Sequence, residues 1–113
     1  MKEIIDYLKQ PIDTLNVEAM AQDLSVSVSY YFTAATYYAE KEMEYTKAVG
    51  KASEAFEDTE LNMKEKESKI KFITSEVKFK QTRADGIVKA LEVRIEALRT
   101  LISKAKTEMT ISK

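Results

Sequence analysis

The sequence contains neither cysteine nor histidine among its 113 residues. The lack of cysteine excludes disulfide frameworks, thiolate zinc sites and cysteine nucleophiles. The lack of histidine removes the commonest metal ligand and the commonest general base at neutral pH. A helical di-metal site built from Glu-x-x-His pairs is excluded as well. We therefore expect no catalytic site, no metal, no cofactor and no small-molecule substrate.

Residues that form turns are scarce, because the chain has two glycines and one proline. A β-sandwich or an α/β fold needs many more turns, so this composition predicts an all-α protein. The hydrophobic fraction of 44% is ordinary for a folded domain. No segment approaches the ~20 apolar residues of a membrane span. The first ten residues also lack the apolar core of a signal peptide. We expect a cytoplasmic protein that has no membrane partner.

Two series of mostly apolar residues keep alternating steps of four and three. This spacing averages 3.5 residues, the repeat of a coiled-coil seam. The first series is Val17, Ala21, Leu24, Val28, Tyr31, Ala35, Tyr38, Glu42, Tyr45, Val49, Ala52 and Phe56. The second is Ile70, Thr74, Val77, Gln81, Ala84, Val88, Leu91, Ile95, Leu98, Ile102, Ala105 and Met109. Each predicted helix therefore has an apolar stripe that must be buried on another helix.

We predict a single helical domain over 1–113. It consists of a short helix at 1–10 and long helices at 15–56 and 60–110. The candidate N-caps of the first long helix are Asp13, Thr14 and Asn16. The stretch 25–32 alternates like a strand, but the apolar stripe runs through it in register, which favours a helix.

The chain is expected to fold back between residues 50 and 62, where one of the two seam series is lost. Asp58 and Thr59 are candidate caps of the helix that follows. A single helix from 15 to 109 would be about 140 Å long. The alternative is such an unbroken helix in an extended bundle.

A hairpin of two helices has only one layer of core. Phe72, Phe79, Ile87 and Leu101 widen the apolar stripe beyond a two-helix seam and would be left exposed. We therefore predict a short helix followed by a long antiparallel hairpin with coiled-coil-type packing, assembled as a homo-oligomer. The expected interface residues are Tyr31, Tyr38, Tyr45, Val88, Leu91, Ile95, Leu98 and Ile102.

Charge is distributed unevenly along the chain, although the net charge is −1. Residues 1–68 carry seven basic and fourteen acidic side chains, whereas residues 69–113 carry eleven basic and five acidic ones. The two segments therefore have net charges of −7 and +6. Two interpretations stay open. Opposite charges pair antiparallel helices or protomers, or a basic face of the C-terminal half contacts phosphate groups.

The candidate nucleic-acid-binding residues are Lys69, Lys71, Lys78, Lys80 and Arg83. Basic side chains in a row neutralise phosphates, but charges that flank a seam equally select a partner helix. Aromatic residues cluster earlier in the chain. Of these, Tyr30, Phe32 and Tyr37 fall off the seam, so they either widen the buried stripe or stay accessible for stacking on bases.

The segment from Lys69 to Met109 resembles the C-terminal helix of small phage proteins grouped with the UvsY-like recombination mediators. The likeness lies in a Leu- and Ile-rich run interleaved with basic residues, ALEVRIEALRTLISKAK, and in the earlier helix segment YYAEKEMEYTKAV. The resemblance implies a ring-forming helical protein that helps to load a recombinase onto single-stranded DNA coated by a single-strand-binding protein. It assigns the DNA contacts to the five basic residues named above.

The leading hypothesis is a non-enzymatic phage accessory protein, a recombination mediator that binds single-stranded DNA weakly. The alternative is a protein-only helical oligomerisation module, which acts as a scaffold, an adaptor or an inhibitor of a host defence system. The arrangement of charge separates the two hypotheses. An exposed basic surface favours DNA, whereas basic faces buried on acidic ones favour the adaptor.

Overall fold

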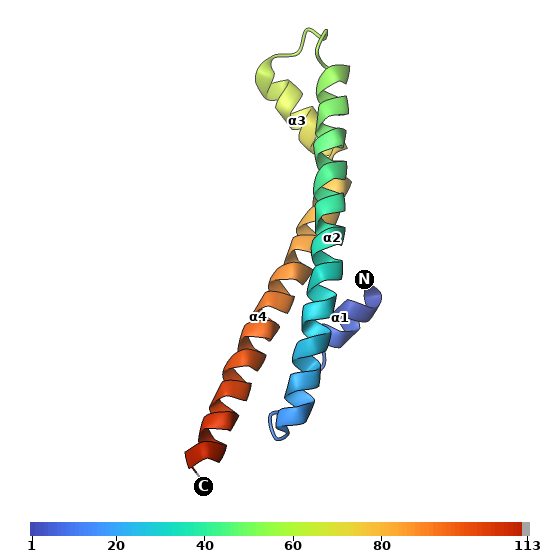
Figure 1. The fold of residues 1–113 in the computed structure, drawn as a ribbon. Helices are drawn as coiled ribbons and strands as arrows, with labels where there is room; N and C mark the ends of the chain where they lie inside the picture. The colour runs from blue at the N-terminus through green and yellow to red at the C-terminus, as the bar shows by residue number, and fades with distance from the viewer. Residues whose placement is uncertain (112–113) are drawn as a thin grey trace. The chain divides into compact units, whose positions relative to one another are not determined.

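The computed structural model describes residues 1–111, and that part of the chain is built from α-helices. Its elements are α1 (Lys2–Leu8), α2 (Val17–Ala55), α3 (Met63–Ile73) and α4 (Ser75–Ile111). Helices α2 and α4 pack against each other and run in opposite directions (Figure 1). The all-α class and the antiparallel hairpin are therefore confirmed. The stretch 25–32 is helical, also as predicted.

Helix α2 begins at one of its predicted caps. The side-chain oxygen of Asn16 accepts hydrogen bonds from the backbone N–H groups of Glu18 at 2.9 Å and Ala19 at 3.2 Å. This is the geometry of an N-cap, which satisfies N–H groups that have no partner inside the helix. Asp13, another predicted cap, instead accepts a hydrogen bond from the N–H of Leu15 at 3.1 Å.

The chain reverses between the end of α2 and the start of α3, within the predicted interval. The cap of α3 is Asn62, whose side-chain oxygen accepts a hydrogen bond from the N–H of Glu65 at 2.9 Å. Thr59, one of the predicted caps, does not cap a helix, because its hydroxyl donates to the carbonyl of Phe56 at 2.8 Å. The helix therefore starts a few residues later than its predicted cap.

The structure corrects the expectation of one uninterrupted helix over 60–110. Helix α3 ends before Thr74, and α4 begins after it. The Thr74 hydroxyl donates to the carbonyl of Ile70 at 2.7 Å, and the Ser75 hydroxyl donates to the carbonyl of Phe72 at 2.9 Å. Side chains that bond to carbonyls of the preceding turn disturb the helix at that point. Two such residues in succession account for the interruption.

The chain divides into two compact units. The first, which we call the terminal unit, comprises Met1–Ala35 and the segment that begins at Gly86. The second, which we call the turn unit, is Thr36–Asp85. Helix α1 belongs to the terminal unit and α3 to the turn unit, whereas α2 and α4 contribute to both.

The core of the terminal unit joins three helices. A cluster of buried residues comprises Ile4 of α1, Ala34 of α2, and Ile87 and Leu91 of α4. Leu98 is fully buried, as its seam position predicts. Ile87, in contrast, was expected to stay exposed. It is buried because partly buried side chains of α1 pack on the cluster that contains it.

Helix α1 also explains a shift in the buried face of α2. The most deeply buried residues of α2 in the terminal unit are Met20, Ser27 and Ala34. Each lies one position before the predicted seam residues Ala21, Val28 and Ala35. A two-helix seam would centre on the predicted residues. Because α1 is a second neighbour of α2, the centre of the buried face moves toward it.

The turn unit has a smaller core. Its buried residues are Ala52, Thr74 and Ala84, none of which has a large side chain. Large apolar side chains instead reach the solvent, with Phe72 82% and Phe79 65% exposed. Both had been predicted to stay exposed in an isolated hairpin.

Candidate functional site

The five predicted nucleic-acid-binding residues all lie in the turn unit and are all exposed. Two of them have neighbours that orient them. The ammonium group of Lys78 lies 4.8 Å from the ring centroid of Tyr45, and that of Lys80 lies 3.8 Å from the carboxylate of Glu76. The remaining three, Lys69, Lys71 and Arg83, have no ion pair or hydrogen bond with another side chain in residues 1–111. The basic residues are therefore not buried on an acidic surface of their own unit.

Two exposed phenylalanines accompany these basic residues, Phe72 near the end of α3 and Phe79 near the start of α4. Residues three, four and seven apart share a face of a helix. Lys69, Phe72, Glu76, Phe79 and Arg83 follow this spacing, and each is exposed. Thr74 separates the two helices that carry the phenylalanines: its N–H donates to the Ile70 carbonyl of α3, and its carbonyl accepts from the N–H of Lys78 in α4, both at 2.9 Å. We call these five residues the outer face of the turn unit.

The three off-seam aromatic residues, for which burial in a wider stripe and stacking on bases were both left open, do not belong to the outer face. Tyr30 packs edge-on against Tyr7, with ring centroids 5.1 Å apart. Lys41 covers the ring of Tyr37 at 5.0 Å. Phe32 is 66% exposed but lies in the terminal unit. The exposed aromatic residues within the basic segment 69–83 are therefore Phe72 and Phe79, and neither belongs to the off-seam set.

The predicted interface residues pack, to different extents, within the single chain. Leu91 and Leu98 are fully buried, and Ile95 is 8% exposed. The remaining five, Tyr31, Tyr38, Tyr45, Val88 and Ile102, are half-buried. Contacts of this set between copies of the chain stay a prediction, because Leu91, Ile95 and Leu98 are already buried within the single chain.

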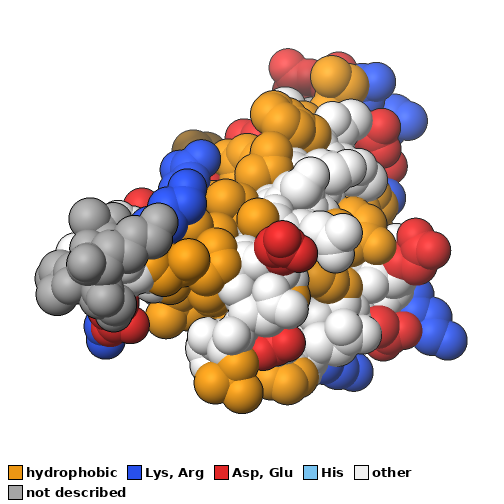
Figure 2. Space-filling view, turned by 60° about the horizontal axis from the view of Figure 1, so that its bottom comes forward, with side chains coloured by type: hydrophobic (Ala, Val, Ile, Leu, Met, Phe, Trp, Pro, Cys, Tyr) orange, Lys and Arg blue, Asp and Glu red, His pale blue; other side chains and the backbone are white. Residues whose placement is uncertain are grey.

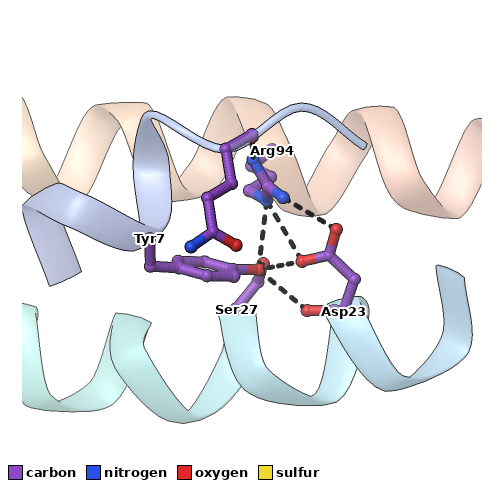
Figure 3. A network of polar contacts seen from close by, with 5 residues as sticks. Tyr7, Asp23, Ser27 and Arg94 are labelled. Atoms are coloured by element: carbon purple, nitrogen blue, oxygen red, sulfur yellow. Dashed lines mark hydrogen bonds and ion pairs between the residues drawn. The ribbon is translucent and has the colours of Figure 1, made fainter. Parts of the chain in front are cut away.

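A polar network in the terminal unit was not predicted from the sequence (Figure 3). The guanidinium of Arg94 on α4 donates two hydrogen bonds to the carboxylate of Asp23 on α2, at 2.8 and 3.2 Å. It also donates to the Tyr7 hydroxyl at 3.0 Å and to the Gln10 carbonyl at 2.7 Å. The Tyr7 hydroxyl in turn donates to Asp23 and contacts the hydroxyl of Ser27. The network thus links α1, α2 and α4.

Burial and charge shift the pKa values within this network. Burial raises the pKa of Tyr7 above its ordinary value of 10.0, and the hydrogen bond with Asp23 raises it further. Burial alone would lower the pKa of Arg94, but its bonds with Asp23 and Tyr7 outweigh that effect and raise it. Arg94 therefore stays charged and Tyr7 stays neutral at physiological pH. The charged and polar groups of this network are hydrogen-bonded to one another, so the network holds the three helices together and presents no free nucleophile.

An apolar groove between α2 and α4 of the terminal unit has a volume of about 520 Å³. It is lined by Val28, Tyr31, Phe32, Glu92, Val93, Ile95, Glu96 and Arg99. Val93 is 70% exposed, and the Tyr31 hydroxyl donates to Glu92 at 3.3 Å. Figure 2 shows that hydrophobic side chains come to the surface in patches, with acidic side chains among and beside them.

No protein-family model, curated protein or solved structure matches this chain. The resemblance to UvsY-like mediators therefore stays a prediction. Within residues 1–111, no group of three or more acidic side chains is placed to hold a metal ion. None of the helices in the same range is long and apolar enough to cross a membrane.

Proposed function

We propose that this chain is a non-enzymatic accessory protein that binds single-stranded DNA weakly through the outer face of the turn unit. One observation carries the proposal: Phe72 at the end of α3 and Phe79 at the start of α4 are strongly exposed and lie between Lys69 and Arg83 in the sequence. Exposed aromatic rings stack on unpaired bases, and neighbouring cations neutralise the phosphates. Stacking of this kind is worth about 1–3 kcal/mol per base.

The charge of this segment supports the proposal. Residues 69–83 contain five basic residues and one acidic residue, Glu76. Glu76 forms an ion pair with Lys80, which lowers the repulsion that its carboxylate exerts on a phosphate. A small number of phosphate contacts predicts modest, salt-sensitive affinity without base specificity. That such binding helps to load a recombinase is a further prediction that rests on the sequence resemblance.

Fluorescence anisotropy with a labelled thymidine oligonucleotide at low salt tests this function. We expect binding in the tens of micromolar range that weakens steeply as salt is added. The double variant Lys69→Glu, Arg83→Glu, which reverses both basic residues of the outer face, should abolish it. The matched control, Lys47→Glu with Lys51→Glu, reverses two exposed charges on α2 of the same unit and should retain most of the binding. No binding by the wild-type protein, or equal losses in both variants, would contradict the proposal.

The second candidate is a protein-only adaptor, and one observation favours it. A hollow of about 420 Å³ in the turn unit is lined by Phe56, Ser68, Lys69, Phe72 and Ile73. An apolar side chain of a partner helix would fit such a hollow. Failure of the oligonucleotide to bind would favour this adaptor, whether it acts as a scaffold or as an inhibitor of a host defence system.

A further inference from the structure

The groove of the terminal unit has features of an interface that is complementary to itself. Each wall presents an exposed apolar side chain, Phe32 of α2 at 66% exposure and Val93 of α4 at 70%. The α4 wall also presents two acids, Glu92 and Glu96, followed by one base, Arg99. Apolar surface of this kind, bordered by polar residues, marks an interaction site.

The charges of the groove decide what kind of partner it fits. Two carboxylates against one guanidinium would repel nucleic acid, which excludes the ligand proposed for the outer face. Neither Glu96 nor Arg99 forms a hydrogen bond or ion pair with another side chain in the described part of the chain. Each is therefore available to a partner that brings the opposite charge.

We propose that the groove receives α4 of a second copy of this chain, related by a two-fold axis. In an antiparallel pair of identical helices, a two-fold axis that passes between residues 97 and 98 places Glu96 of each copy opposite Arg99 of the other. Both ion pairs form at once because the contact is isologous. The apolar residue Val93 of each copy is covered in the same contact.

The architecture that results is familiar from helical proteins. Two antiparallel hairpins joined through α4 make a four-helix arrangement, in which residues such as Val93 gain the second layer of packing that a lone hairpin lacks. The inference goes beyond the proposed function and does not depend on it, because the groove and the outer face lie in different units.

Sedimentation equilibrium at tens of micromolar protein tests the inference. The wild-type protein should sediment with twice the 12.9 kDa mass of the chain. Glu96→Arg alone and Arg99→Glu alone should each shift the equilibrium toward monomer, because each variant places like charges opposite each other. An equimolar mixture of the two single variants should form a dimer again, because each supplies the charge that the other requires. The double variant should likewise dimerise with itself.

Two control variants carry the same charge changes elsewhere. Glu54→Arg and Arg83→Glu alter exposed residues of the turn unit and should leave the dimer unchanged. A monomeric wild-type protein would overturn the inference, as would failure of the mixture to associate while each single variant remains folded by circular dichroism. A dimer that is insensitive to both single variants would place the contact elsewhere and would also overturn it.

Discussion

The guanidinium carbon of Arg94 lies 4.5 Å from the centre of the Tyr7 ring, and the Arg94 Nε group donates a hydrogen bond to the Tyr7 hydroxyl at 3.0 Å. One side chain of α4 thus contacts both the face and the polar tip of a residue in α1. Helix α1 has seven residues, and an isolated helix of that length is marginal in water. Its place in the terminal unit therefore depends on this contact and on the burial of Ile4.

Replacing Arg94 should destabilise the terminal unit. The Arg94 side chain is 9% exposed and that of Asp23 is 15% exposed. Arg94→Ala would leave the Asp23 carboxylate largely buried without its cation, a change that costs about 3–5 kcal/mol in buried pairs. Urea denaturation measures the loss. Arg94→Lys should recover only part of it, because a lysine cannot make the two parallel hydrogen bonds. Full recovery would contradict the importance of the forked geometry.

The pH dependence of stability should carry a signature of Tyr7. Burial raises the pKa of Tyr7 in the folded protein, so the folded state holds this proton more tightly than the unfolded state. Tyr7 contributes its full stability below pH 10, and that contribution is lost as the pH rises through the raised pKa. Thermal unfolding between pH 9 and 11 should show a steeper decline in the wild-type protein than in Tyr7→Phe. Parallel curves would contradict this assignment.

Leu98 should be among the most sensitive core positions. It is fully buried in the terminal unit, and Leu98→Ala should cost about 2–5 kcal/mol of the free energy of unfolding. Met43→Ala provides a control on α2, because the Met43 side chain is 60% exposed. Its effect should stay within about 0.5 kcal/mol of zero. Urea denaturation measures both, and equal effects would show that the buried face is misassigned.

The start of α3 should depend on Asn62. Its side-chain oxygen accepts from the N–H of Glu65, and its amide nitrogen donates to the Glu65 carboxylate, both at 2.9 Å. Asn62→Ala should cost about 1 kcal/mol, whereas Asn62→Asp should keep the cap. Hydrogen exchange should locate the loss at the first turn of α3. Unchanged protection there in Asn62→Ala would contradict this role of the cap.

Much of the fold could be predicted because a 3.5-residue repeat indicates helices and, to within one position, the faces that they bury. The position of the turn followed from the loss of one seam series. The interruption at Thr74 could not be predicted, because it depends on two hydroxyls that compete for local carbonyls. The shift in the buried face of α2 depends on where α1 packs, and a periodic pattern in one helix carries no information about a third helix.

The candidate sites were predictable to different degrees. The basic residues of the outer face, and the exposure of Phe72 and Phe79, followed from the pattern of the last long helix. The Arg94 network did not, because its partners Tyr7 and Asp23 are 87 and 71 residues away in the sequence. Ser27 gave no signal either, because the predicted seam ran through Val28, one position away.

The most direct test of the proposed function is residue-resolved NMR of the isotope-labelled protein during titration with a thymidine oligonucleotide. Backbone amide signals of residues 69–83 should shift progressively, whereas those of the terminal unit should change little. The double variant Phe72→Ser, Phe79→Ser should weaken the shifts without altering the fold. Shifts confined to the terminal unit, or none with excess oligonucleotide, would contradict DNA binding by the outer face.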